Sequence, residues 1–180
     1  MARLEKWIEK EGEDVLRVIG IKESQNVIDF GCGSGVYSII ASRIVGNSGK
    51  IYAIDSDEKG LLVDLIEKVK KDKIMNIAII KTSGEIDFRF PDESIDVIFM
   101  YDILHLLNDY EIDKLIKESN RLLKKGGFIS YHVTHIGEIN LEEIHNKMKN
   151  NGFSVNRKFK KPMFHWAWIE DSTIFNFYKE

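Results

Sequence analysis

The stretch Val27–Gly35, V-I-D-F-G-C-G-S-G, limits the possible folds of this chain more than any other. An apolar run ends at Asp29, glycines follow at positions 31, 33 and 35, and residues 36–45 have helical apolar spacing. A strand that turns through glycines into a helix brings bare backbone close to a nucleotide-like ligand in α/β sheets. A dinucleotide fingerprint would place its third glycine at position 36, where this chain has valine, so the spacing argues against a nicotinamide site.

Apolar periodicity predicts strands that alternate with helices along most of the chain. We expect helices at 3–19 with Gly12 as a possible break, 35–45, 58–71, 109–124 and 140–150. We expect strands at 26–30, 50–54, 76–81, 95–100, 128–134, 153–159 and 173–178. The run Lys124–Gly127, K-K-G-G, is typical of the basic last turn and glycine stop of a helix. Such alternation indicates a mainly parallel sheet with helices on both faces.

Composition excludes several classes of protein. The 180 residues fit one domain, and the net charge of −3 gives no overall basic field for nucleic acid. A single cysteine, Cys32, excludes an internal disulfide and a cysteine-rich metal site. No stretch approaches the ~18 uncharged apolar residues that span a bilayer, and the charged N-terminus argues against a signal peptide. We therefore expect a cytoplasmic protein without a membrane partner.

Three further blocks follow the glycine-rich stretch. Ile51–Asp55 is a second apolar run that ends in a carboxylate, where an acid can accept both ribose hydroxyls of a nucleotide. Phe90–Met100 reads F-P-D-E-S-I-D-V-I-F-M, and Leu122–Gly127 reads L-L-K-K-G-G. Together the four blocks resemble the class I S-adenosylmethionine (SAM)-dependent methyltransferases, especially the small single-domain type. The resemblance covers residues 24–134.

This resemblance implies a fold and a domain organisation. The fold is α/β: a doubly wound, mainly parallel seven-stranded sheet with an antiparallel last strand and helices on both faces. Residues 1–180 would form one methyltransferase domain, with an N-terminal helix at 1–20 and a cofactor-binding core at 24–134. Residues 135–180 would supply a helix and a C-terminal hairpin.

The resemblance also implies SAM as the cofactor. The turn residues Gly31, Gly33 and Gly35 would wrap its methionine and ribose portions. Asp29 would balance the positively charged amino-acid portion, directly or through water, and Asp55 would accept the ribose hydroxyls. Cys32, between the glycines, is expected to fill space rather than act as a nucleophile.

The adenine contact departs from the family pattern. Alignment from the F-P-D-E-S block puts Gly84 at the position of the usual acid, with Glu85 beside it. Glu85 could serve through a one-residue shift, or the backbone of Ser83 and Gly84 could. Ser56 and Asp57 could touch the adenine edge, and Asp57 is also placed to cap the helix predicted at 58–71.

Three residues are candidates for the chemistry: Tyr101, His105 and His132. Tyr101 follows the fourth strand and could offer its ring to a cationic methyl donor, or fill the sheet edge. Asp102 and His105 are one helical turn apart and could share a face, with His105 contacting substrate or serving structure. A base is needed only if the acceptor arrives protonated, and His105 or His132 could then act.

The spacing His132-x-x-His135 also suggests a metal. A metal site needs three or four ligands, and no cysteine or carboxylate is clearly placed to complete this one. We therefore predict no metal, and interpret a histidine on this rim as a base or substrate contact.

A basic segment near the C-terminus is followed by aromatic residues: Arg157, Lys158, Lys160 and Lys161, then Phe164, His165, Trp166 and Trp168. This composition can grip single-stranded nucleic acid, and it is equally that of a solvated hairpin with an aromatic inner face. The tryptophans could also line a substrate pocket or form a dimer contact.

We expect methyl transfer from SAM to a small-molecule acceptor, with nucleic acid disfavoured and a homodimer possible. The short N-terminal helix and the short stretch 135–141 predict little cover over the site, hence an open site, a large substrate or a pocket completed by a second subunit. The alternatives are a non-catalytic SAM-binding regulatory or partner protein and an RNA or protein methyltransferase. Tyr101–Leu104 reads Y-D-I-L, not the Asn/Asp-Pro-Pro-aromatic run of enzymes that methylate base amino groups.

Overall fold

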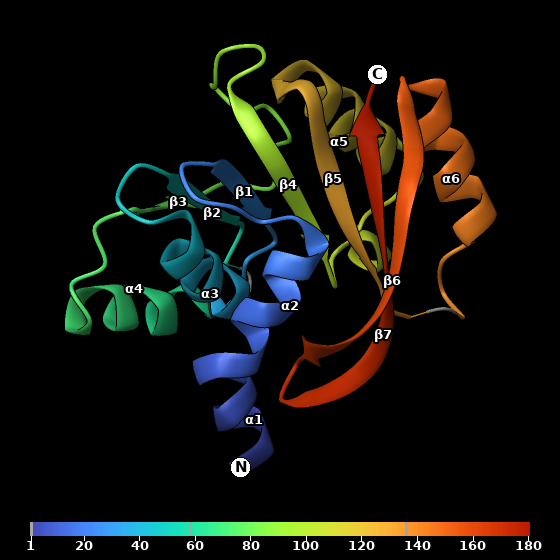
Figure 1. The fold of residues 1–180 in the computed structure, drawn as a ribbon. Coiled ribbons are helices and arrows are strands. Elements are labelled where there is room, and N and C mark those ends of the chain that lie inside the picture. The colour runs from blue at the N-terminus through green and yellow to red at the C-terminus, as the bar shows by residue number, and fades with distance from the viewer. Residues whose placement is uncertain (1, 58, 136) are drawn as a thin grey trace.

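Seven strands form one sheet in the computed structural model, which describes residues 2–57, 59–135 and 137–180 (Figure 1). The strands are β1 (Asn26–Phe30), β2 (Lys50–Asp55), β3 (Ile77–Lys81), β4 (Ile95–Tyr101), β5 (Leu123–Val133), β6 (Phe153–His165) and β7 (Trp168–Lys179). Their order is β3-β2-β1-β4-β5-β7-β6, and β7 runs antiparallel to both of its neighbours. The predicted fold class, with its reversed last strand, is confirmed.

The helices agree with the predicted pattern except at their ends. They are α1 (Ala2–Lys6), a π-helical turn η1 (Trp7–Glu11), α2 (Gly12–Ile19), α3 (Val36–Val45), α4 (Leu62–Lys71), a 3-10 turn η2 (Leu104–Leu106), α5 (Asp109–Leu122) and α6 (Leu141–Asn150). Gly12 does not break the first helical segment, which continues from η1 into α2. The helix predicted from 58 begins at Leu62, because Gly60 has a positive φ of 67°; residue 58 lies outside the described part. No helix among the described residues is long and apolar enough to cross a membrane.

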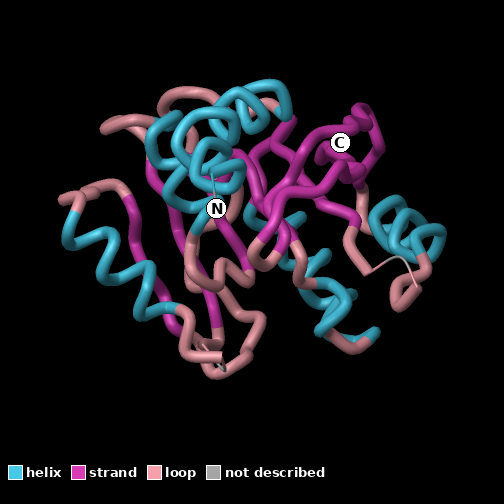
Figure 2. The backbone as a smooth tube through the Cα atoms, turned by 90° about the horizontal axis from the view of Figure 1, so that it is seen from below, coloured by secondary structure: helices cyan, strands magenta, loops and turns pink. Residues whose placement is uncertain are grey.

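Alternation along the strands divides the apolar core between the two faces of the sheet (Figure 2, where the magenta strands run between cyan helices). Val97 and Phe99 of β4 pack in one cluster with residues of α2, α3 and α4. Ile98 and Met100, which point to the opposite face, pack with residues of α5 and α6. Strand β4 is therefore buried on both faces, as expected for a parallel strand covered by helices.

The prediction that Lys124–Gly127 form the basic last turn and glycine stop of a helix is wrong. Helix α5 ends at Leu122, and the four residues belong to β5, where they form an irregularity between the pairs Ile95–Leu123 and Val97–Phe128. Lys124 donates from Nζ to the Asp96 carboxylate at 2.8 Å, a contact with the neighbouring strand that a helical end would not allow. The K-K-G-G run fits both structures locally, and the strand contact decides between them.

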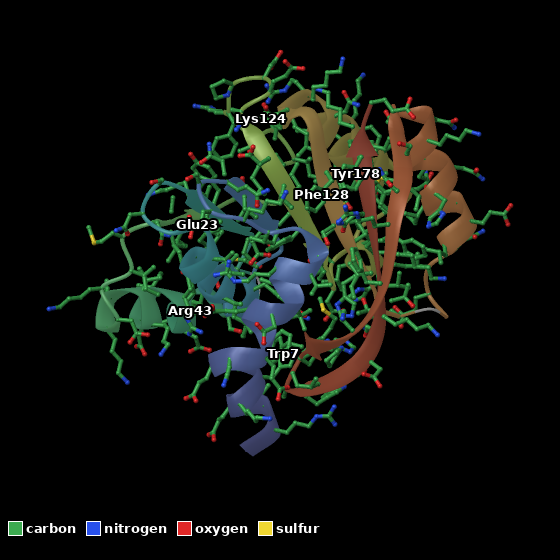
Figure 3. All side chains as sticks on the ribbon, viewed as in Figure 1. Trp7, Glu23, Arg43, Lys124, Phe128 and Tyr178 are labelled. Carbon is green, nitrogen blue, oxygen red and sulfur yellow. The ribbon has the colours of Figure 1, made fainter. Side chains whose placement is uncertain are left out.

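Strands β6 and β7 are much longer than predicted and form a hairpin that reaches back over the N-terminal helices (Figures 1 and 3). The indole Nε1 of Trp7 donates to the Pro162 carbonyl at 2.9 Å, and the Tyr37 hydroxyl donates to the Phe164 carbonyl at 2.7 Å. Pro162 is tolerated because β6 is an edge strand. The far end of the hairpin is therefore fixed beside the carboxyl end of the sheet.

Candidate functional site

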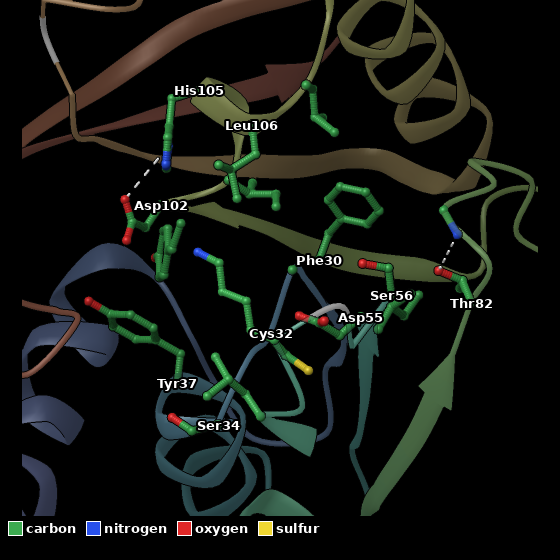
Figure 4. Close-up of a pocket in the computed structure, with 18 of the residues that line it drawn as sticks. Phe30, Cys32, Ser34, Tyr37, Asp55, Ser56, Thr82, Asp102, His105 and Leu106 are labelled. Carbon is green, nitrogen blue, oxygen red and sulfur yellow. Dashed lines mark hydrogen bonds and ion pairs between the residues drawn. The ribbon is translucent and has the colours of Figure 1, made fainter. Parts of the chain in front are cut away.

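A pocket of about 690 Å³ lies at the carboxyl ends of β1, β2 and β4 (Figure 4). The chain builds the sheet outward from β1 in one direction through β2 and β3, and in the other through β4 and β5. The crevice at such a change of direction is where open α/β sheets bind ligands. The volume is within the ~300–1,000 Å³ of small-molecule sites.

The glycine-rich turn forms the floor of this pocket. Gly31 has a φ of 74°, and a Cβ there would lie 2.7 Å from the Ile103 side chain. Gly35, the N-cap of α3, has a φ of 75°, and a Cβ there would overlap the Leu65 side chain. The turn is held to the neighbouring strand by the N–H of Gly31, which donates to the Ile54 carbonyl at 2.8 Å. Only glycine allows these side chains to pack so closely against the backbone of the turn.

Asp55 ends β2 and points across to the turn. One carboxylate oxygen accepts the backbone N–H of Gly33 at 2.8 Å, and the other accepts that of Asp57 at 2.6 Å. A carboxylate has about four lone-pair positions, so the two N–H donors fix its orientation and still leave positions for ligand hydroxyls. The side chain lines the pocket, as predicted.

Asp29 lies behind the turn rather than in the pocket lining. Its carboxylate is 3% exposed and accepts the Ser38 hydroxyl of α3 at 2.6 Å. Burial raises the pKa of Asp29 to about 6, and the Ser38 hydrogen bond opposes that rise. Cys32 lines the pocket, and burial raises the pKa of its thiol well above the ordinary value. A thiol kept protonated fills space, as expected, and does not supply a nucleophile.

The residues predicted near the adenine lie together on one wall. Ser56, Gly84 and Glu85 line the pocket beside Thr82, from the loops after β2 and β3. Asp57 turns away from it: its side chain accepts the backbone N–H of Leu62, the first residue of α4, at 3.0 Å. Asp57 therefore accepts one N–H of the first turn of α4, as a cap does, while the N-cap position itself is Leu61.

The opposite wall is aromatic. The Tyr101 ring lies 4.6 Å from that of Tyr37 and stacks on Phe99, and its hydroxyl is 2.8 Å from the Ser130 hydroxyl. Phe164 and Trp166, from the tip of the β6–β7 hairpin, complete this wall. The hairpin therefore adds aromatic cover to the pocket, and Trp166 is one of the tryptophans that the sequence offered as a pocket wall.

One cation crosses the mouth of the pocket. The Lys59 ammonium, from the loop after β2, lies 4.3 Å from the centroid of the Trp166 ring. Both residues line the pocket, so this cation–π contact joins its two walls.

The histidines occupy different environments. His105 lines the pocket, and burial together with the neighbouring His135 lowers its pKa. His132 is fully buried behind Tyr101 and does not line the pocket, and burial lowers its pKa to about 3. Of the two candidate bases, only His105 faces the cavity (Figure 4).

His135 does not pair with His132 but lies with two side chains from other elements. Asp102, after β4, and His165, the last residue of β6, offer ligand atoms within 4.8 Å of one another and of His135. The prediction that no metal binds rested on the lack of a carboxylate to complete the site. That prediction considered the pair His132 and His135; the structure instead places the Asp102 carboxylate and His165 beside His135.

Comparison with known proteins identifies the family to which the chain belongs. Residues 27–127, more than half of the chain, match a family described as a methyltransferase domain. The chain belongs to the methyltransferase domain family. It is 32% identical over 133 residues to a probable cobalt-precorrin-6B C(15)-methyltransferase (decarboxylating) of Saccharolobus solfataricus, across 74% of this chain and 62% of that protein.

Two further similarities extend over more of this methyltransferase-family chain. A demethylmenaquinone methyltransferase of Listeria welshimeri is 26% identical over 163 residues, 89% of this chain and 67% of that one. A crystal structure of a SAM-dependent methyltransferase from Aquifex aeolicus superposes with a TM-score of 0.76 at 25% identity, covering 96% of this chain and 91% of that one. The chain thus spans less than two thirds of the Saccharolobus relative and about two thirds of the Listeria one.

SAM, the cofactor predicted from the sequence, is confirmed for the family, and the residues of this chain fit it. The turn closes so tightly at Gly31 and Gly35 that a Cβ would collide with neighbouring side chains, which keeps the backbone bare beside the ligand. Asp55 presents an oriented carboxylate to the pocket, a group of the kind that accepts ribose hydroxyls. When bound, SAM supplies an activated methyl group.

Some predicted residues lie outside the cavity, and some of its walls were not predicted. Gly33, Gly35 and Asp29 support the turn without lining the pocket. Lys59 gave no signal in the sequence, because an isolated lysine on a polar loop is ordinary. The basic residues Arg157, Lys158 and Lys160 are exposed along β6, where charge protects an edge strand from pairing with another chain.

Proposed function

We propose that this chain transfers a methyl group from SAM to a small-molecule acceptor. The observation that carries the proposal is a single cavity with two chemically different halves. One half contains the Gly31–Gly35 turn and Asp55, which suit an adenosyl cofactor, and the other contains Tyr101, His105 and Trp166.

The names of the relatives support an acceptor of this size class. The Saccharolobus protein is named for a cobalt-precorrin and the Listeria protein for demethylmenaquinone, both small molecules. The net charge of −3, with basic residues spread along an exposed edge strand, supports a small molecule over nucleic acid.

The residues that line the cavity would contribute to methyl transfer by binding the reactants, by excluding water and by accepting a proton. Tyr37, Phe164 and Trp166 form an apolar wall that would keep water from the reacting atoms. His105 has a lowered pKa and is therefore neutral near pH 7, with its buried Nδ1 free of any hydrogen bond among the described residues. A neutral imidazole at this wall can take the proton from an acceptor that arrives protonated.

The first experiment is calorimetric titration of the purified protein with SAM, its demethylated product and NAD. We expect the first two to bind in the micromolar range and NAD not to bind. Absence of SAM binding to folded, ligand-free protein would overturn the proposal.

The second experiment supplies methyl-labelled SAM with three acceptor pools: small molecules, RNA and protein. Label in the small-molecule pool is expected, and its loss in Asp55→Ala would link it to this site. Label only in RNA or protein would overturn the acceptor class, whereas binding without any turnover would favour a non-catalytic SAM-binding protein.

A further inference from the structure

Three side chains from distant parts of the chain converge beside the pocket. Asp102 follows β4, His135 follows β5, and His165 ends β6. The Asp102 carboxylate has one oxygen 3.3 Å from Nε2 of His135 and the other 3.2 Å from Nε2 of His165. Asp102 and His135 have positive φ values of 54° and 50°, a backbone conformation that is strained in residues other than glycine and that gathers at functional sites.

These short contacts are not hydrogen bonds. Oδ1 of Asp102, Nε2 of His135 and Nε2 of His165 are all buried, and none has a hydrogen-bond partner in the described part of the chain. Buried polar atoms without partners are rare and require an explanation.

The far sides of both imidazole rings face carboxylates. Nδ1 of His165 is hydrogen-bonded to Glu170 at 3.1 Å, and Nδ1 of His135 lies 3.5 Å from the Glu138 carboxylate. In a neutral imidazole whose Nδ1–H donates, Nε2 carries a lone pair. The lone pair of His165 then faces the Asp102 oxygen at 3.2 Å, and two acceptors at that distance repel each other unless a cation lies between them. A carboxylate behind the ring is also the usual support of a metal-bound histidine.

We propose that Asp102, His135 and His165 bind one divalent transition-metal ion, with Zn²⁺ as the best match. Zn²⁺ bonds to histidine nitrogen and carboxylate oxygen are about 2.0–2.2 Å long. Tetrahedral bonds of that length place neighbouring ligand atoms about 3.4 Å apart. The two imidazole nitrogens lie 3.3 and 3.2 Å from different oxygens of the Asp102 carboxylate, and one ligand atom from each of the three residues lies within 4.8 Å of the others. Two imidazoles and one carboxylate leave a fourth position open, the pattern of a catalytic rather than a structural site.

Of the three proposed ligands, Asp102 lines the pocket. Asp102 and His105 both line the pocket, and Nδ1 of His105 is 3.8 Å from the Asp102 carboxylate (Figure 4). An ion here would hold an oxygen atom of a ligand in the aromatic half of the pocket. In terms of the proposed function, on which this step rests, the acceptor is a small molecule with a hydroxyl or carboxylate oxygen able to coordinate the ion.

Metal binding is tested on tag-free full-length protein, stripped with a chelator and titrated with Co²⁺ while visible absorption is recorded, then with Zn²⁺ as competitor. One equivalent of Co²⁺ with the intense bands of a tetrahedral or five-coordinate site is expected. Glu170→Gln should lower the affinity about 10- to 100-fold, and Asp102→Ala and His165→Gln should lower it further. His145→Gln is the matched control, because His145 lies on α6 against Phe175 and Phe177.

Two results would overturn the proposal: no stoichiometric Co²⁺ or Zn²⁺ binding by the folded protein, or unchanged binding in His165→Gln. Circular dichroism and thermal unfolding establish that each variant is folded.

SAM titrations of the metal-free and metal-loaded protein separate this inference from the proposed function. Metal binding without SAM binding would overturn the proposed function and leave the metal site standing. If SAM binds equally in both forms, acceptor labelling should disappear with chelator and return with Zn²⁺. Labelling that persists without metal would overturn the role in holding the acceptor.

Discussion

The backbone N–H of Gly33 donates to the Asp55 carboxylate across 2.8 Å, which ties the end of β2 to the turn that follows β1. The second oxygen accepts the N–H of Asp57 at 2.6 Å. We expect Asp55→Ala to lower the affinity for SAM at least tenfold, because a hydrogen bond to a charged group contributes about 1.5–3 kcal/mol. Asp55→Asn should also bind poorly, since its NH₂ group must face one of the two N–H donors. Titration calorimetry measures both.

Asp72→Ala is the matched control for these variants. Asp72 follows α4, is exposed, and pairs with Lys68 at 2.7 Å outside the pocket. Its SAM affinity should equal that of the wild type. Unchanged affinity in Asp55→Ala would show that the carboxylate does not contact the cofactor.

Gly35 and Gly126 allow the steric role of the turn to be separated from its backbone conformation. Both have φ near +75°, but a Cβ at Gly35 would overlap Leu65, whereas a Cβ at Gly126 would meet nothing within 4 Å. Gly126→Ala should cost about 1–2 kcal/mol of unfolding free energy for its left-handed backbone. Gly35→Ala should cost about 1–3 kcal/mol more because it overpacks the site. Urea denaturation measures the unfolding free energy of both variants, and equal decreases in the two would contradict the steric argument.

The parts of the site that could be predicted from the sequence are those built by local chain geometry. The Gly31–Gly35 turn and Asp55 each follow a strand directly, so the apolar run and the residue types fix their positions at the sheet edge. Parallel packing then brings neighbouring strand ends together, whatever the rest of the chain does.

The parts that could not be predicted depend on how far the hairpin extends. Asp102 and His165 meet because β6 continues to residue 165 instead of ending at 159. Met163 and Phe164 of that segment pack in the cluster that also contains Trp7 and Tyr37, a contact between parts of the chain that are far apart in the sequence. No local pattern in the sequence predicts that contact.

Asp29 should make stability depend on pH in an unusual direction. Its pKa is raised from 3.8 to about 6 by burial, so the folded state holds the proton more tightly than the unfolded state. The stabilisation is complete below about pH 4 and is lost as the pH rises through 6. Asp29→Asn keeps an acceptor for Ser38 and should be more stable than the wild type at pH 7, by on the order of 2–3 kcal/mol, but not at pH 4. Chemical denaturation at pH 7 and pH 4 measures the difference in unfolding free energy between Asp29→Asn and the wild type. An equal difference at the two pH values would refute the prediction.

The Tyr37 hydroxyl holds the hairpin tip that covers the pocket. It donates to the Phe164 carbonyl at 2.7 Å, and its ring contacts those of Tyr101 and Trp7. Tyr37→Phe keeps the ring contacts and leaves the carbonyl without this donor, so unfolding free energy should fall by about 1–3 kcal/mol. Amide hydrogen exchange should rise at the hairpin tip, residues 162–168, and SAM should bind more weakly. Tyr110→Phe, at a 74% exposed position of α5, should change none of these. Unchanged exchange in Tyr37→Phe would mean that aromatic packing alone holds the hairpin over the site.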